Sequence, residues 1–244
     1  MELLHLVQNI FMAMEERFLL ISILTSKNCT MKKMIKPFLM LTLSLGVFTS
    51  CVKDDDFAVT SFKETVYKEV FDSYIVNDDE YLNFGDWTSF VEAGSVHWFE
   101  KETDNNGYLE FTSYLSGEAT NIAWAITPKI NLDKSENEVL TFKTSSEFVS
   151  DPANKIEVFI SNDFDGTNVL AATWTPITAT LANNSTNILS SDSNGFININ
   201  SGEIDLSTIT GDIYIAFKGT GSGTNITLDG SLRLDDIKIY DKNL

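Results

Sequence analysis

Cysteine, histidine and basic side chains are all scarce in this chain of 244 residues. It holds two cysteines, two histidines and four prolines, and its 17 Lys and Arg residues face 35 Asp and Glu residues, for a formal charge of −18. Proteins bind nucleic acids by neutralising phosphates with Lys and Arg, so this composition argues against a nucleic-acid partner. A zinc site needs several His or Cys ligands, and only His97 remains beyond residue 51.

Residues 31–50 have the composition of a secretory signal. Three lysines, at positions 32, 33 and 36, precede a charge-free and mostly apolar run from Phe38 to Ser50. The run is shorter than the roughly 20 residues needed to cross a bilayer. A buried core helix is the alternative, but the Lys-rich start and the Asp-rich segment that follows argue against it. Residues 1–30 fit no part of this pattern, and we interpret them as a mis-assigned start rather than a domain.

The end of this segment resembles a bacterial lipobox, in which the chain is cut before a cysteine that becomes lipidated. The sequence is Phe-Thr-Ser-Cys at 48–51, with Phe48 where leucine is usual. The following Lys53-Asp-Asp-Asp56 is similar to the export signal of Bacteroidetes surface lipoproteins, although a plain charged linker is the alternative reading. We therefore expect lipidation of Cys51, a membrane attachment through lipid at the cell-surface side of the outer membrane, and a polar tether over residues 51–68.

Beyond the tether, residues 69–244 read as one all-β domain. Alternating apolar residues predict strands at 108–115, 121–127, 138–145, 155–161, 196–198, 212–218 and 225–228. Clusters of Asn, Asp, Gly and Ser separate these segments, which is typical of a β-sandwich. A short helix is expected near 63–70. With Cys51 lipidated no disulfide is possible, so the apolar core has to stabilise the domain.

The last predicted strand, 231–240, changes its alternation at one point. Leu232 and Leu234 share one parity, whereas Ile237 and Ile239 share the other. A shift of one residue turns side chains to the opposite face of a sheet, so we predict a β-bulge at Asp235-Asp236.

Several segments in order resemble a known family. They are Trp124-Ala-Ile-Thr-Pro-Lys-Ile-Asn-Leu132, Ile160-Ser-Asn-Asp-Phe-Asp-Gly-Thr167 followed by Ala172-Thr-Trp-Thr-Pro-Ile177, Gly202-Glu-Ile-Asp-Leu-Ser207 with 213–218, and Leu234-Asp-Asp-Ile-Lys-Ile239. Together they are similar to the choice-of-anchor J and DUF5017-like surface lipoproteins of Bacteroidetes. The resemblance implies a jelly-roll β-sandwich like galactose-binding and carbohydrate-binding modules, and it implies no particular ligand.

Candidate chemistry is sparse. His97 alone cannot supply a Ser-His-Asp arrangement, and Glu203-Ile-Asp-Leu-Ser-Thr208 lacks the second glutamate of a glycosidase strand that it superficially resembles. In similar jelly rolls a structural calcium joins the first and last strands, which would place it near Asp72 and Asp235; an acid pair without metal is the alternative. Residues 162–166 are interpreted as a tight turn rather than a calcium loop.

Aromatic side chains suggest where a ligand would bind. Trp124 and Trp174 are expected in the core. Trp87 and Trp98 lie in a loop-rich region, 83–103, and are the better candidates for a ligand-binding face, with core packing as the alternative for each. The sequence thus predicts a non-catalytic surface module that binds a glycan or another extracellular ligand. The alternatives are a structural or adhesion lipoprotein that binds a protein, and a glycan hydrolase.

Overall fold

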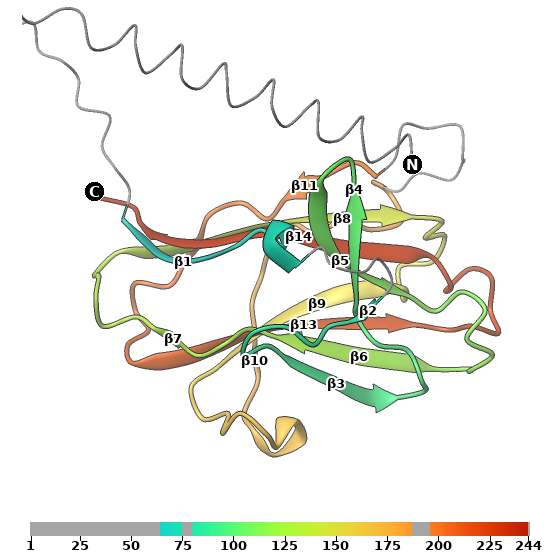
Figure 1. Ribbon diagram of the computed structural model, residues 1–244, viewed down its shortest axis with the longest axis horizontal. Coiled ribbons are helices and arrows are strands. Elements are labelled where there is room, and N and C mark those ends of the chain that lie inside the picture. The colour runs from blue at the N-terminus through green and yellow to red at the C-terminus, as the bar shows by residue number, and fades with distance from the viewer. Residues whose placement is uncertain (1–63, 75–79, 187–195, 244) are drawn as a thin grey trace, which may run out of the picture. The chain divides into compact units, whose positions relative to one another are not determined.

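The computed structural model describes residues 64–74, 80–186 and 196–243 (Figure 1). These residues form strands and two short 3-10 helices, and none of their helices is long and apolar enough to cross a membrane. The elements are β1 (Thr65–Glu69), η1 (Asp72–Tyr74), β2 (Glu80–Tyr81), β3 (Thr88–Ala93), β4 (Phe99–Thr103), β5 (Asn106–Thr112), β6 (Asn121–Ile126), β7 (Ile130–Asn131), β8 (Glu138–Glu147), β9 (Lys155–Ser161), η2 (Val169–Ala171), β10 (Thr175–Pro176), β11 (Ile199–Asn200), β12 (Ile204–Asp205), β13 (Asp212–Gly221) and β14 (Ser231–Asp241).

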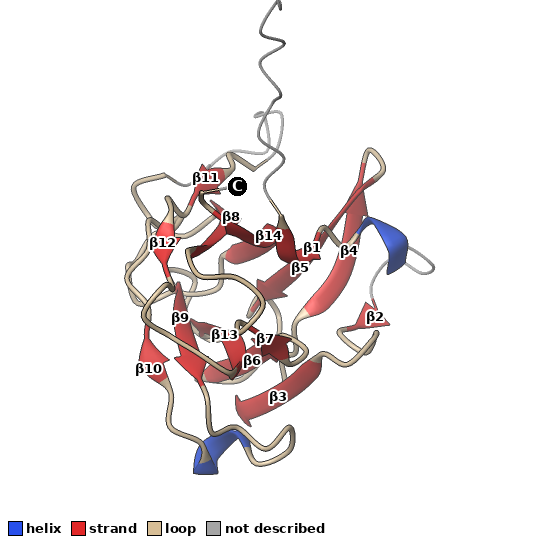
Figure 2. Ribbon diagram, turned by 90° about the vertical axis from the view of Figure 1, so that its left-hand side faces the viewer, coloured by secondary structure: helices blue, strands red, loops and turns tan. Residues whose placement is uncertain are grey.

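Two antiparallel sheets lie face to face, as Figure 2 shows from one end. The larger sheet has the order β11-β8-β14-β5-β4-β2, with β1 added to β14 and β12 added to β8. The smaller sheet has the order β10-β9-β13-β6-β3, and β7 pairs with β13. The β-sandwich expected from the sequence is confirmed.

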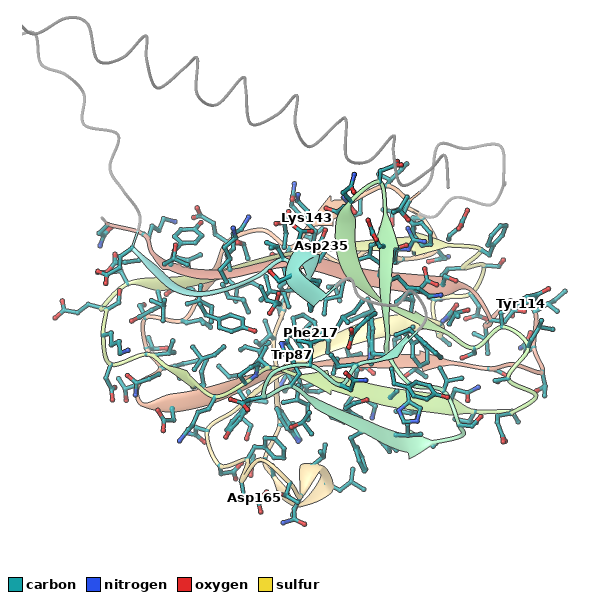
Figure 3. The ribbon with its side chains drawn as sticks, viewed as in Figure 1. Trp87, Tyr114, Lys143, Asp165, Phe217 and Asp235 are labelled. Carbon is teal, nitrogen blue, oxygen red and sulfur yellow. The ribbon has the colours of Figure 1, made fainter. Side chains whose placement is uncertain are left out.

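The core lies between the two sheets because the strands alternate buried and solvent-facing residues. Ile156, Val158 and Ile160 of β9 are buried, and so are Ile213, Ile215 and Phe217 of β13, as the period of two predicts. Phe217 meets Phe142 of the other sheet with ring centroids 5.2 Å apart (Figure 3). Burying one such ring contributes about 1.5–3 kcal/mol, so these facing rings are a main part of what holds the layers together.

A second, smaller apolar cluster covers the outer side of the small sheet. Trp124 is buried there against Trp174, with ring centroids 5.5 Å apart, and Phe164 also packs on Trp174. Trp124 is buried as expected, whereas Trp174 is half-buried and packs against this outer cluster. The loop at 162–168 is a turn, as expected: Asp163 accepts from the Thr173 amide, and Asp165 accepts from the amides of Thr167 and Asn168. The carboxylates of Asp163 and Asp165 therefore stabilise the loop itself.

The bulge predicted in β14 is present. The pairing with β8 runs from Asp235 opposite Lys143 to Lys238 opposite Thr141, so β14 has one extra residue there. Asp236 takes the left-handed backbone conformation, with φ of 53°. On the other side of β14, β5 pairs with Ser231–Leu234 and β1 pairs with Ile237–Tyr240. The bulge therefore lies where one partner strand ends and the next begins.

Several local expectations are wrong. The segment near 63–70 is a strand rather than a helix, because β1 pairs with β14, and the sheet begins at Thr65, inside the range expected for the tether. Residues 225–228 form a turn, closed by the Leu228 amide on the Asn225 carbonyl. The region 83–103 is not mainly loop, because β3 pairs with β6 and β4 pairs with β5.

Candidate functional site

Three loops gather at one end of the sandwich, at the right in Figure 1. They connect β5 to β6 (113–120), β8 to β9 (148–154) and β13 to β14 (222–230). The Gly223 amide donates to the Glu118 carbonyl at 2.8 Å, and the Asp151 amide donates to the Thr227 carbonyl at 3.1 Å. At Gly230 a Cβ would lie 2.7 Å from the Glu147 carbonyl oxygen, so only glycine allows this close approach.

The loops enclose a cavity of about 760 Å³, which we call the loop-end pocket. Its apolar wall is formed by three exposed side chains: Tyr114 is 63% exposed, Phe148 44% and Ile226 83%. Figure 3 shows Tyr114 at the extreme end of the molecule. The polar wall is lined by Glu110, Thr112, Ser150, Asp229 and Ser231. Large exposed apolar groups next to a few polar ones are the usual composition of a ligand pocket.

Phe148 reaches the surface through an unfavourable backbone conformation. Its φ is 59°, a left-handed value that side chains with a Cβ rarely adopt. Leu115, the neighbour of Tyr114 in another of the three loops, has φ of 60° and is also exposed. Strain of this kind costs about 1–3 kcal/mol per residue and is concentrated at functional sites, so the loop-end pocket is the place to look for function.

An ion pair fixes the floor of the pocket. Arg233 on β14 binds Glu110 on β5, with Nε and Oε2 2.7 Å apart. The guanidinium is also stacked between Tyr108, 4.1 Å from its ring centroid, and Phe196, 3.2 Å away. Burial raises the pKa of nearby Glu147, an effect that Arg233 opposes and Glu110 reinforces. These contacts make the strand side of the pocket rigid while its rings project from loops.

The tryptophans proposed as a binding face lie in the core. Trp98 is fully buried, and its indole N–H donates to the Ala123 carbonyl at 3.1 Å. Trp87 is buried against Phe71, with ring centroids 5.6 Å apart. Neither offers a ring face to a ligand, because each lies in a buried connection directly before a strand, Trp87 before β3 and Trp98 before β4. The expectation of a binding face at these two residues is therefore corrected.

Asp72 and Asp235 do come to the same place, the start of β5. Asp72 Oδ1 accepts from the Gly107 amide at 2.9 Å, and Asp235 Oδ2 accepts from the Asn106 side chain at 3.1 Å. The other oxygen of Asp235 accepts from the Asp236 amide. Burial raises the pKa of Asp235, although these hydrogen bonds oppose the shift.

These contacts do not fit a calcium site. Calcium takes six to eight oxygen ligands. In the part of the chain that the structure describes, no group of three or more His, Cys, Asp or Glu is placed to hold a metal ion. Asp72 and Asp235 instead accept hydrogen bonds from Gly107 and Asn106 of β5.

Other sequence candidates are accounted for as follows. Cys51, the signal at 31–50 and most of the tether lie outside the described residues. His97 is stacked on Tyr81, with ring centroids 4.4 Å apart. Glu203 accepts from the Tyr240 hydroxyl at 3.2 Å and is paired with Lys242.

Sequence reasoning missed Tyr114, Phe148 and Ile226. One signal was available in the sequence: Ser and Gly residues between 113 and 117 indicate a turn, so the strand expected at 108–115 should end near Thr112, as β5 does. The three loops meet although they lie far apart along the chain, at 113–120, 148–154 and 222–230, and local sequence does not indicate this meeting.

Comparison with known proteins identifies a family and finds solved structures of low similarity. No curated protein matches the chain. The K1 cleaved adhesin domain of Lys-gingipain from Porphyromonas gingivalis W83 is 18% identical with a TM-score of 0.43, covering 73% of this chain and 99% of that one. The K3 domain is 17% identical with a TM-score of 0.41, covering 68% and 99%. The glycoside hydrolase domain of Endo-D from Streptococcus pneumoniae R6 is 15% identical with a TM-score of 0.38, covering 65% and 22%.

These structural likenesses are too low to carry an argument about function. The family model is more extensive, because it matches residues 103–241, from the end of β4 through β14. This range includes the loops of the loop-end pocket and more than half of the chain. The chain therefore belongs to the family described as Domain of unknown function (DUF5017).

Proposed function

We propose that this protein is a non-catalytic binding module on the cell surface, and that it binds a glycan in the loop-end pocket. The observation that carries the proposal is the gathering of Tyr114, Phe148 and Ile226, all exposed, at the mouth of a 760 Å³ cavity. An isolated exposed apolar residue needs no explanation, but a cluster next to a cavity marks an interaction site.

A sugar suits the chemistry of this pocket. One face of a pyranose ring carries C–H groups that pack on an aromatic ring, and its rim carries hydroxyls that need hydrogen-bond partners. The pocket supplies both, with Tyr114 and Phe148 on one side and Asp229, Ser150 and Ser231 on the other. A protein loop with apolar side chains is the second candidate, favoured by the high exposure of Ile226.

The arrangement of carboxylates supports binding rather than hydrolysis. A glycosidase needs one carboxyl group to act as an acid and a second as base or nucleophile. Of the two acids that line the pocket, Glu110 is held in an ion pair with Arg233. Its carboxylate is therefore bound to a protein cation and is not directed at a ligand.

The proposal includes the anchor predicted from the sequence. Lipid on Cys51 would hold the protein at the outer membrane through a tether that enters the sandwich at β1. The Asp241 amide donates to the Glu64 carbonyl at 3.0 Å, so the chain enters beside the end of β14. Ser231, at the start of β14, lines the loop-end pocket. The pocket and the entry point thus lie at opposite ends of one strand, which suits a module that faces away from its membrane.

A glycan array probed with the purified full chain tests the binding proposal. We expect binding to a defined glycan class, lost in Tyr114→Ala and Phe148→Ala. The matched control is Tyr81→Ala, which removes another exposed tyrosine outside the pocket. Equal loss in the control, or no glycan bound by a folded protein, would contradict the glycan and favour a protein partner. Turnover of a bound glycan would show an enzyme.

Metabolic labelling with palmitate tests the anchor. The wild-type chain should incorporate the label and Cys51→Ser should not. A mature protein that retains Glu2 in its N-terminal mass would contradict both the anchor and the assignment of residues 1–30 as a mis-assigned start.

A further inference from the structure

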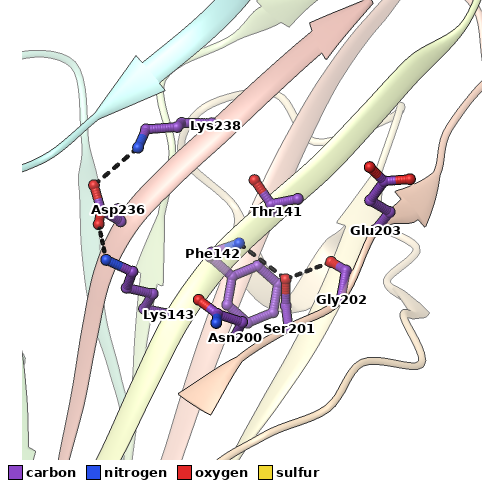
Figure 4. Close-up of a pocket in the computed structure, with 9 residues that line it drawn as sticks. All are labelled: Thr141, Phe142, Lys143, Asn200, Ser201, Gly202, Glu203, Asp236 and Lys238. Carbon is purple, nitrogen blue, oxygen red and sulfur yellow. Dashed lines mark hydrogen bonds and ion pairs between the residues drawn. The ribbon is translucent and has the colours of Figure 1, made fainter. Parts of the chain in front are cut away.

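The outer face of the larger sheet carries a second cavity, of about 350 Å³, between β8, β14 and the segment around β11. Figure 4 shows its lining residues, and we call it the outer-face cavity. Lys143 of β8 and Lys238 of β14 both reach Asp236 between them, and Lys238 Nζ lies 3.1 Å from Asp236 Oδ1. The cavity is separate from the loop-end pocket, since the two share no lining residue.

The β14 bulge creates this cluster. The extra residue puts Asp236 on the outer side while Asp235 and Ile237 on either side of it are buried. Burial raises the pKa of Asp236, but hydrogen bonds from Lys143 and Lys238 outweigh it and leave that pKa below its usual value. The hydrogen bond to Asp236 also raises the pKa of Lys143. Asp236 and Lys143 are therefore both charged at neutral pH.

The cluster brings two lysines to one carboxylate, which is unusual in a chain with a net charge of −18. One carboxylate, Asp236, serves two ammonium groups. The other acid that lines the cavity, Glu203, is already paired with Lys242. Buried Asp235 also acts electrostatically on Lys143, so the basic character of this face does not come from the lining alone. Asp236 fixes the positions of the two lysine side chains in advance.

A further lysine lies next to this cluster. Lys68 of β1 is directly opposite Lys238 in the register, so the two side chains share the outer face. Like charges directly opposite each other across strands destabilise a sheet. Within the described segments Lys68 forms no ion pair. Lys68, Lys238 and Lys143 thus form a basic row across β1, β14 and β8 despite this cost. Such a row favours the binding of an anion.

We propose that the outer-face cavity binds an acidic sugar unit, whose carboxylate or sulfate group contacts the ammonium groups of Lys143 and Lys238 on their cavity side. The side chains of Thr141 and Asn200 line the same cavity and supply hydroxyl and amide partners for the sugar hydroxyls. A cavity of this size lies at the lower end of the range for small-molecule sites, which suits a single residue of a polysaccharide. The site stands on its own residues and does not depend on the loop-end pocket.

Affinity electrophoresis of the full chain through gels containing polygalacturonate, dextran sulfate or neutral dextran tests the proposal. We expect retardation by one of the two acidic polymers and none by dextran. Retardation should weaken as NaCl is raised, because partly exposed charge pairs are screened. The double variant Lys143→Gln/Lys238→Gln should lose about tenfold in affinity, as expected for removing two such contacts.

The matched control removes the same charge elsewhere. Lys129 and Lys155 form exposed ion pairs with Asp212 and Glu157, so Lys129→Gln/Lys155→Gln should bind as the wild type does. Equal loss in both double variants, or no retardation of a folded wild-type chain by either acidic polymer, would overturn the proposal. Carboxylate and sulfate are distinguished by which polymer retards the chain. Tyr114→Ala should leave this retardation unchanged, so failure of the loop-end pocket and failure of this site are distinguishable.

Discussion

Replacing Phe148 by glycine should give a more stable protein than replacing it by alanine. Both changes remove the same partly exposed ring, so the lost burial cancels between them. Alanine keeps the left-handed strain at φ of 59°, which costs about 1–2 kcal/mol for a residue with a Cβ. Glycine removes this strain but loses about 0.4–1 kcal/mol through the greater freedom of its unfolded chain. The glycine variant should therefore be the more stable by about 1 kcal/mol.

Thermal unfolding followed by circular dichroism measures this difference, which corresponds to about 2–4 °C for a domain of this size. Tyr114 provides the control, because its φ is not positive. There the usual order should hold, with Tyr114→Ala more stable than Tyr114→Gly. A Phe148→Ala variant as stable as Phe148→Gly would refute the reasoning, since it would show that the backbone of this loop carries no strain. Both Phe148 variants should lose glycan binding, which separates stability from function.

Gly230→Ala should destabilise the protein by about 1–3 kcal/mol in urea unfolding, because the new Cβ would meet the Glu147 carbonyl at 2.7 Å; an unchanged midpoint would show that the loops can separate freely. Asp236→Asn should cost up to about 1 kcal/mol at neutral pH. The native pKa of Asp236 is below its ordinary value of 3.8, so its contribution is complete above that pH and disappears as the pH falls through the native pKa. Melting curves of both proteins should therefore converge in acid, and a constant difference would contradict the ion-pair origin. Calcium added after treatment with a chelator should leave the melting temperature unchanged, because Asp72 and Asp235 already accept hydrogen bonds from β5; a rise that depends on calcium concentration would show a site that these contacts do not explain.

The sequence was most informative where local pattern determines structure. Alternation placed β9 at its observed bounds and identified which side of β13 faces the core, because one face of a strand in a sandwich is buried along its whole length. The parity change at Asp235-Asp236 located the bulge for the same reason. The strand between residues 63 and 70 could not be predicted from local sequence, because it forms by pairing with β14, which is distant along the chain.

The binding residues could not be predicted in the same way. Trp98 has the loop-like surroundings expected of a ligand contact, yet its ring lies in the core, where its indole N–H donates to the Ala123 carbonyl of β6. Phe148 reads as one more apolar residue after a strand, and only its φ and its exposure set it apart. The lysines of the outer-face cavity are far apart in sequence and are brought together by the register of β8 with β14.

The antiparallel pairing of β1 with β14 has a mechanical consequence. In a protein held at Cys51 and by a ligand at the opposite end, tension would enter through β1 and run along the strands. A pull in that direction slides β1 past β14, so the hydrogen bonds of Thr65–Glu69 resist it together and do not open one after another. Strand β1, although short, would then resist shear when the cell and its ligand move apart.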